Sequence, residues 1–227
     1  TPKPSSAASD VYKRQLLGFD LWEFSLSSFF RRYGWVFLFK VVFKHPLRTF
    51  SGLLRYTRWR RGVRDHDEVL RLGASSEVGK GWLVGLGFCM KPLDCPSGRF
   101  NHDCALLSSG EAKGPCIGCR IGEVGMRALK CGADVYIMTS SEDVVYHMFV
   151  PMLKGRYRNV LLFLCPYTSK VMALPLLICG VGGMIVRYCS GYCKDYRDFL
   201  RADRGEKPER TDISPSSEEM VERWLGG

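Results

Sequence analysis

The sequence predicts an α/β protein, with a mainly parallel sheet carrying helices on both faces and a basic amphipathic helical segment before it. Strand-like and helix-like stretches alternate about every 25 residues from residue 134 onward, which is typical of parallel sheets. The run 159–164 is almost wholly apolar, as expected for a strand covered on both faces. Hydrophobic residues make up 46% of the chain, enough for a sizeable core.

Four segments follow from the composition. Residues 1–15 resemble a sequencing-adapter artefact, because Asp10 to Gln15 back-translate to a transposon end used in library preparation, and we exclude them from functional reasoning. Residues 16–64 form the basic, aromatic helical segment, residues 65–80 a polar linker, and residues 81–227 a cysteine-rich α/β domain.

The net charge of +10 belongs to one segment. From Arg31 to Arg64 the chain has ten Lys or Arg and no Asp or Glu, and the remaining 23 basic residues balance the 23 acidic ones. We expect this segment to act as a structural cap or as an amphipathic surface on an anionic membrane, with nucleic acid phosphates as a third alternative. The candidate contact residues are Arg31, Arg32, Lys40, Lys44, Arg48, Arg55, Arg58, Arg60 and Arg61.

The helical segment has an internal boundary. Pro46 limits how far one helix can run, and a second short helix is expected over 49–60. The spacing of Lys40, Lys44 and Arg48 would place them on one helical face. The longest uncharged run, 33–39, is far shorter than the roughly 20 residues that a membrane span needs.

The domain that follows shows strands and helices in turn. We expect strands at 82–88, 134–138, 159–164 and 183–188. We expect helices at 117–130, 141–153, 169–178, 192–200 and 216–225. Ser141 is the expected cap of the second helix, and Gly180 is the expected end of the third.

Three of these strands are followed by cysteines. Cys89, Cys165 and Cys189 come directly after expected strands, and Cys193 lies four residues further on. Parallel strands would bring them to one edge of the sheet, where sites form in open sheets. They are a candidate second metal site or a set of redox thiols, although packed free thiols explain Cys189 and Cys193 equally well. Cys131 and Cys179 end helices, so we expect them at the opposite edge.

The densest chemistry lies between residues 89 and 119. Cys95 and Cys104 precede the Cys-x-x-Cys pair Cys116 and Cys119, and these four thiolates would suffice for one metal centre. Gly and Pro around them favour an irregular loop whose backbone N–H groups can hydrogen-bond cluster sulfides. An iron–sulfur cluster of the 4Fe–4S type is the leading interpretation, with structural zinc, redox thiols and no metal as alternatives. His102 is a candidate ligand or a donor to one.

Several motifs are absent from the sequence. Cys189 and Cys193 begin a radical S-adenosylmethionine motif, but Tyr196 stands where its third cysteine should be. Gly180 to Gly183 precedes a strand, whereas a dinucleotide fingerprint follows one. We find no P-loop, catalytic triad or paired-carboxylate signature.

The cysteine pattern resembles a known group of proteins. The motifs that carry the resemblance are Cys-Pro…Cys…Cys-x-x-Cys-x-Ile-Gly, then Gly132-Ala-Asp-Val-Tyr-Ile, then Val160-Leu-Leu-Phe-Leu-Cys-Pro. In these motifs the chain resembles an uncharacterised prokaryotic family of cysteine-rich domain-of-unknown-function proteins thought to bind metal. The resemblance covers residues 85–195. It implies an α/β domain with thiolate ligands at Cys95, Cys104, Cys116, Cys119 and Cys165, and it implies no reaction.

Together these observations favour an iron–sulfur protein with a redox or electron-transfer support role and a redox partner protein. The alternatives are a zinc-stabilised module that docks on an anionic membrane and a thiol-redox enzyme that uses Cys116/Cys119 or Cys189/Cys193. Metal-type cysteine spacing and the lack of a visible signal peptide favour a reducing compartment. We therefore expect a cytoplasmic protein, also a candidate for the inner membrane face.

Overall fold

The computed structural model describes residues 38–73 and 77–226. The chain divides into two compact units, residues 1–44 and 45–227. In the first unit the described part contains the π-helix η2, Leu38–Val42. Residues 1–15, Arg31 and Arg32 lie outside the described residues.

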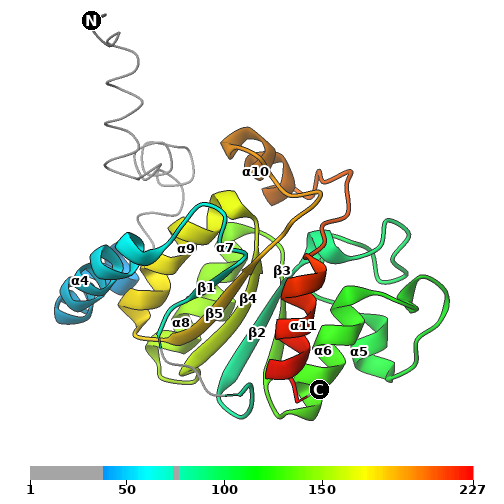
Figure 1. Cartoon of the computed structure of the whole chain (residues 1–227), viewed down its shortest axis with the longest axis horizontal. Coiled ribbons are helices and arrows are strands. Elements are labelled where there is room, and N and C mark those ends of the chain that lie inside the picture. Colours follow the sequence, from blue (N-terminus) through cyan, green and yellow to red (C-terminus); the bar gives the residue numbers. More distant parts are fainter. Residues whose placement is uncertain (1–37, 74–76, 227) are drawn as a thin grey trace, which may run out of the picture. The chain divides into compact units, whose positions relative to one another are not determined.

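The second unit is built on a sheet, as Figure 1 shows. Its described strands are β1 Val69–Arg71, β2 Trp82–Gly87, β3 Asp134–Met138, β4 Asn159–Leu164 and β5 Gly182–Arg187. They lie in the order β1-β5-β4-β2-β3, and all neighbouring pairs are parallel except β1 with β5. The predicted mainly parallel sheet is therefore confirmed.

Helices and helical turns connect the strands. The α-helices are α4 Pro46–Gly62, α5 Ala105–Ser109, α6 Arg120–Lys130, α7 Ser141–Val144, α8 Val150–Leu153, α9 Pro166–Cys179, α10 Tyr196–Asp203 and α11 Pro215–Trp224. The shorter turns are η3 Phe88–Met90, η4 Gly114–Cys116 and the π-helix η5 Val145–Phe149.

The strand order reverses between β2 and β4. From β2 the chain passes through α6 to β3, on one side of β2, and then returns through α7, η5 and α8 to β4 on the other side. The right-handed crossover rule then predicts α6 on one face and α7, α8 and α9 on the other. In open α/β sheets, ligands bind outside the carboxyl ends of the strands at such a reversal, which here are the ends of β2 and β4.

The centre of the sheet is the core. In β4, residues 160–164 are all buried, and in β2 all six residues are buried. These strands read as continuous apolar runs because their side chains are buried on both faces of the sheet. The predicted bounds 134–138 and 159–164 match β3 and β4.

Some predicted boundaries are wrong. The helix after β3 is capped by Ser140, whose Oγ accepts a hydrogen bond from the Asp143 N–H at 3.4 Å, and not by Ser141. Helix α9 begins at Pro166, three residues before the expected start, because proline suits the first helical position. Its predicted end is confirmed, since Gly180 is the left-handed C-cap.

The basic segment also differs from expectation. α4 begins at Pro46, so Arg48 belongs to that helix while Lys44 lies in the turn before it. The predicted alignment of Lys40, Lys44 and Arg48 on one helical face is therefore wrong. The segment 65–80, expected as a linker, contains the edge strand β1, which pairs with β5.

Candidate functional site

The carboxyl ends of β2, β4 and β5 meet at one edge of the sheet, and each is followed by a cysteine. β4 pairs in parallel with both β2 and β5. Cys89 lies in η3 directly after β2, and Cys165 is the N-cap of α9 directly after β4. The loop after β5 brings in Cys193, while Cys189 in the same loop is exposed. The sheet therefore gathers Cys89, Cys165 and Cys193, which we call the thiol cluster.

Cys165 and Cys193 are in direct contact. The backbone N–H of Cys193 donates a hydrogen bond to Cys165 Sγ at 3.4 Å. Both side chains are buried, with 8% and 3% of their surface exposed. Two elements 28 residues apart in sequence thus place two thiols together.

The two thiols differ in acidity. The Cys165 side chain lowers the pKa of Cys193, and the nearby Lys207 ammonium acts in the same direction. The Cys193 side chain raises the pKa of Cys165, and burial adds to this effect. Burial also raises the pKa of Cys89. Cys193 is therefore the member of the thiol cluster that ionises first.

Two hydroxyl groups complete the surroundings of Cys89. The Thr211 hydroxyl donates to Cys89 Sγ at 3.2 Å, and burial raises the pKa of the Tyr188 hydroxyl, which approaches the same sulfur. Tyr188 donates to the Phe163 carbonyl at 2.8 Å and accepts from the Gly87 N–H at 3.2 Å. The phenol therefore ties β5 to both β4 and β2 beside the thiols.

A strap, residues 205–212, lies against the cluster. The Thr211 N–H donates to the Cys89 carbonyl at 3.0 Å, and the Cys189 N–H donates to the Asp212 carbonyl at 2.9 Å. The Arg99 guanidinium donates to three backbone carbonyls: that of Cys89 at 3.3 Å, that of Glu209 at 3.0 Å and that of Lys207. These contacts fasten the strap to the backbone on either side of the thiol cluster.

The predicted metal-ligand loop is organised around a buried ammonium. Lys91 is 1% exposed. Its Nζ donates to Asn101 Oδ1 at 2.6 Å and to the carbonyls of Asp103, Gly98 and Asn101 at 2.8, 2.9 and 3.0 Å. Burial lowers the pKa of Lys91, while the thiols of Cys95 and Cys104 act in the opposite direction.

The four leading ligand candidates lie in the loops on either side of α5. Cys116 and Cys119 are buried, and Cys95 and Cys104 are partly exposed. Cys104 and Cys119 interact with each other electrostatically, and both interact with Lys91. Within residues 38–73 and 77–226, no three His, Cys, Asp or Glu side chains form a group arranged to hold a metal ion.

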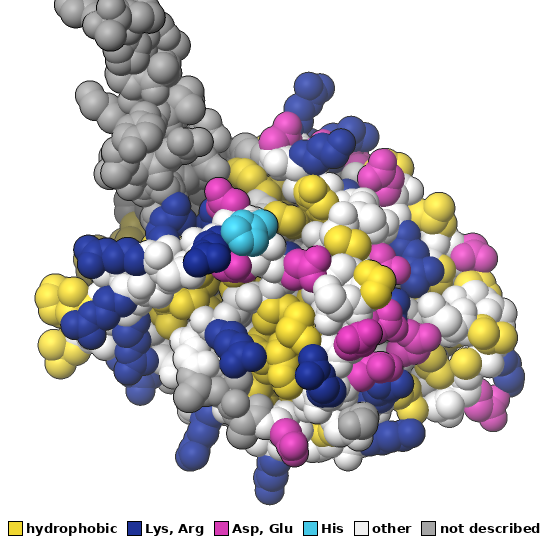
Figure 2. All heavy atoms as spheres, viewed as in Figure 1, with side chains coloured by type: hydrophobic (Ala, Val, Ile, Leu, Met, Phe, Trp, Pro, Cys, Tyr) yellow, Lys and Arg dark blue, Asp and Glu magenta, His cyan; other side chains and the backbone are white. Residues whose placement is uncertain are grey.

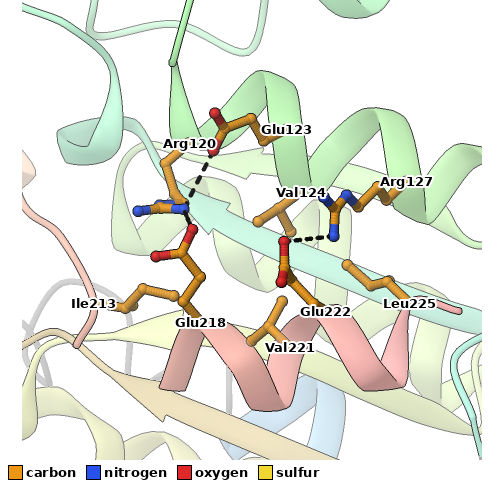
Figure 3. A pocket seen from close by; sticks show the side chains of 9 residues that line it. All are labelled: Arg120, Glu123, Val124, Arg127, Ile213, Glu218, Val221, Glu222 and Leu225. Atoms are coloured by element: carbon orange, nitrogen blue, oxygen red, sulfur yellow. Dashed lines mark hydrogen bonds and ion pairs between the residues drawn. The ribbon is translucent and has the colours of Figure 1, made fainter. Parts of the chain in front are cut away.

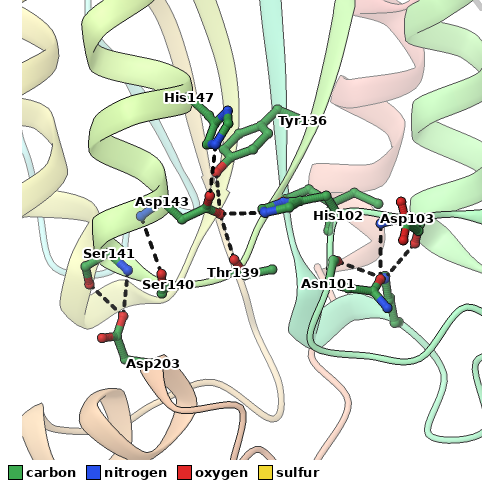
Figure 4. A network of polar contacts seen from close by, with 12 residues as sticks. Asn101, His102, Asp103, Tyr136, Thr139, Ser140, Ser141, Asp143, His147 and Asp203 are labelled. Atoms are coloured by element: carbon green, nitrogen blue, oxygen red, sulfur yellow. Dashed lines mark hydrogen bonds and ion pairs between the residues drawn. The ribbon is translucent and has the colours of Figure 1, made fainter.

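A polar network that the sequence did not predict surrounds Asp143, in the first turn of α7 (Figure 4). Its carboxylate accepts from the Tyr136 and Thr139 hydroxyls, both at 2.7 Å. His102 Nε2 lies 3.0 Å from the same oxygen, and His147 Nε2 lies 3.4 Å from the other. Burial raises the pKa of the Tyr136 hydroxyl, and its hydrogen bond to the Asp143 carboxylate raises it further.

Only His102 of this network was a candidate in the sequence. Its Nδ1 lies 2.7 Å from the Ile137 carbonyl, and its ring stacks on Tyr136 with centroids 5.5 Å apart. The spacing of Asp143 and His147 is the sequence feature that could have predicted the network, because a carboxylate and an imidazole four residues apart on a helix face each other. The network fixes the loop carrying His102 against β3.

A cavity of about 160 Å³ lies between α6 and α11 (Figure 3). Its polar walls are ion pairs: Arg120 contacts Glu123 at 3.2 Å and also Glu218, and Arg127 contacts Glu222 at 2.8 Å. Each arginine already has a carboxylate, so the charges serve to join the two helices.

No described helix has both the length and the apolar character needed to cross a membrane. The chain matches no protein-family model, and neither curated proteins nor solved structures give a significant match.

Proposed function

We propose that the protein carries out thiol–disulfide redox chemistry, with Cys193 as the attacking thiol and Cys165 as its resolving partner. The observation that carries this proposal is the hydrogen bond from the Cys193 backbone N–H to Cys165 Sγ, which brings the two buried cysteines together at the carboxyl edge of the sheet. Cys165 follows β4, which borders the reversal of strand order where open α/β sheets bind their ligands.

The proposed reaction uses a disulfide, R–S–S–R′, as the oxidant. The Cys193 thiolate attacks one sulfur, so that a mixed disulfide forms and R′S⁻ leaves. Cys165 then loses its proton and attacks the Cys193 sulfur, which forms the Cys165–Cys193 disulfide and releases RS⁻. Two protein thiols are oxidised, one disulfide is reduced, and the two protons go to the released thiolates.

The neighbouring groups suit these roles. The lowered pKa of Cys193 raises its thiolate fraction, which is the nucleophilic form. The raised pKa of Cys89 keeps that thiol protonated while Cys193 reacts. Because Cys193 is 3% exposed, an oxidant reaches it only after a local opening, which we expect at the strap, so the pair is best tested at equilibrium.

An iron–sulfur or zinc centre at Cys95, Cys104, Cys116 and Cys119 is the second candidate function. The buried Lys91 ammonium favours it, because its four hydrogen-bond partners are neutral oxygens and the thiols of Cys95 and Cys104 lie near enough to act against the lowering of its pKa by burial, as does Asp103. Thiolates bound to a metal would place negative charge beside this ammonium. An iron–sulfur cluster there would give the chain an electron-transfer role with a redox partner protein, whereas zinc would have a structural role.

The decisive experiment equilibrates the full reduced chain, prepared without oxygen, in mixtures of reduced and oxidised glutathione. Free thiols are then trapped by alkylation and counted by mass spectrometry. We expect one two-electron transition that Cys165→Ser and Cys193→Ser each abolish, with Cys131→Ser and Cys179→Ser as controls that keep it. A transition that survives both active-pair variants would rule out the pair.

The same preparation separates the second candidate. Iron, acid-labile sulfide and zinc are measured before oxidation. Metal that is lost in Cys116→Ala/Cys119→Ala but kept in Cys193→Ser would support the metal centre. Metal content that is unchanged in Cys116→Ala/Cys119→Ala, or absent after anaerobic reconstitution, would rule out these ligands.

A further inference from the structure

Helix α4 exposes large hydrophobic side chains while its opposite side is fixed to the protein. Gly52 and Tyr56 are its buried residues, and α4 packs along α9. A Cβ at Gly52 would lie 2.5 Å from Ile178 Cα, so the two helix backbones approach closely there. The orientation of α4 on the second unit is therefore fixed by this side.

The opposite side carries one stripe of residues. Positions 47, 50, 54, 58 and 61 follow steps of three and four, which places them on one helical face. The first three are Leu47, Phe50 and Leu54, which are 85%, 65% and 48% exposed. Leu53 beside them is 44% exposed. These four side chains form an exposed apolar surface on α4 that extends from Leu47 to Leu54.

The charged residues of α4 itself all have one sign. The stripe continues with Arg58 and Arg61, while Arg48 and Arg55 lie beside it, and α4 contains no acidic residue. Figure 2 shows hydrophobic and basic side chains adjacent over α4, at the left edge of the view. Exposed apolar residues flanked by arginines are the pattern of helices that lie in a membrane interface.

We propose that α4 docks the protein on an anionic lipid bilayer, with Leu47, Phe50 and Leu54 in the interface and Arg58 and Arg61 against lipid phosphates. A bilayer accounts for both halves of the stripe. Nucleic acid phosphates would contact the arginines but would leave a leucine that is 85% exposed without a partner. This inference stands independently of the thiol chemistry.

The test is flotation of the full chain with phosphatidylcholine vesicles, with and without phosphatidylserine. We expect binding that requires phosphatidylserine and weakens with salt, because salt screens the arginines. Leu47→Ser/Phe50→Ser should lower the partition coefficient about tenfold or more. Arg58→Gln/Arg61→Gln should lower it by about fivefold per arginine.

Matched controls keep the result specific to α4. Leu129→Ser removes an exposed leucine of α6, and Lys130→Gln/Arg158→Gln removes two exposed charges elsewhere, so both should bind as the unaltered chain does. Circular dichroism checks that every variant is folded. Equal vesicle binding by the α4 variants and the unaltered chain would overturn the proposal. So would a chain that ignores vesicles but self-associates or binds nucleic acid through the same residues.

Discussion

The backbone N–H of Cys193 donates to Cys165 Sγ at 3.4 Å, and this contact joins the loop after β5 to the first residue beyond β4. The contact places the Cys165 side chain beside Cys193, where it lowers the pKa of the Cys193 thiol. The difference in acidity between the two cysteines follows from this arrangement.

The first prediction concerns that contact. Folding lowers the pKa of Cys193 below the ordinary 9.0, so its thiolate stabilises the native state at high pH and this stabilisation is lost as the pH falls through the folded pKa. Cys165→Ala removes the thiol and should raise the pKa of Cys193, whereas Cys165→Ser keeps a polar O–H group there and should retain part of the shift. The measurement is the pH dependence of Cys193 alkylation by iodoacetamide. Identical profiles for the two variants would contradict the assignment.

The second prediction concerns Lys91. Lys91→Met would remove an ammonium that satisfies four oxygens, and we expect a loss of about 3 kcal/mol or more in the free energy of unfolding. Urea unfolding measures it, with the exposed Lys130→Met as the control. A loss no larger than that of the control would show that the loop does not depend on the buried charge.

The third prediction concerns the contact between α4 and α9. Gly52→Ala places a methyl group 2.5 Å from Ile178 Cα and should cost about 1–3 kcal/mol by overpacking. Gly62→Ala, at the end of the same helix, meets nothing within 4 Å and should not destabilise the protein. Thermal unfolding compares the two. Equal melting temperatures would mean that α4 is not held against α9 at this point.

The fourth prediction concerns the strap. Gly191 has a φ of 58°, and a Cβ there would lie 2.1 Å from the Arg210 carbonyl oxygen. Gly191→Ala should displace the strap and accelerate alkylation of Cys193. Gly155→Ala is the matched control. Gly155 also has a positive φ, 78°, but a Cβ there would meet nothing within 4 Å. This variant therefore shares with Gly191→Ala only the backbone strain of about 1 kcal/mol. If both variants leave the alkylation rate unchanged, the strap does not gate the thiols.

Local patterns predicted the sheet well. β3 and β4 were predicted with their observed bounds because each is a short apolar run between turn signals. β1 was missed because it has three residues and is defined by its antiparallel pairing with β5, more than a hundred residues away. The position of Ser140 as cap, in place of Ser141, depends on one side-chain contact that sequence spacing does not resolve.

The candidate site was predicted in part. Parallel topology correctly brings Cys89 and Cys165 to one edge, together with Cys193. The contributions of Thr211 and Tyr188 could not be predicted, because Thr211 reaches Cys89 across 122 residues of sequence. The sequence grouped Cys189 with Cys193, whereas the loop turns Cys189 to the surface.

The most direct test of the central claim is a disulfide map of the full chain after equilibration with oxidised glutathione. Alkylation of the remaining thiols, digestion without reduction and mass spectrometry identify which cysteines are joined. We expect a linked peptide containing Cys165 and Cys193, with Cys131 and Cys179 alkylated. A map that joins Cys116 to Cys119, or that shows only glutathione on the exposed Cys189, would contradict it.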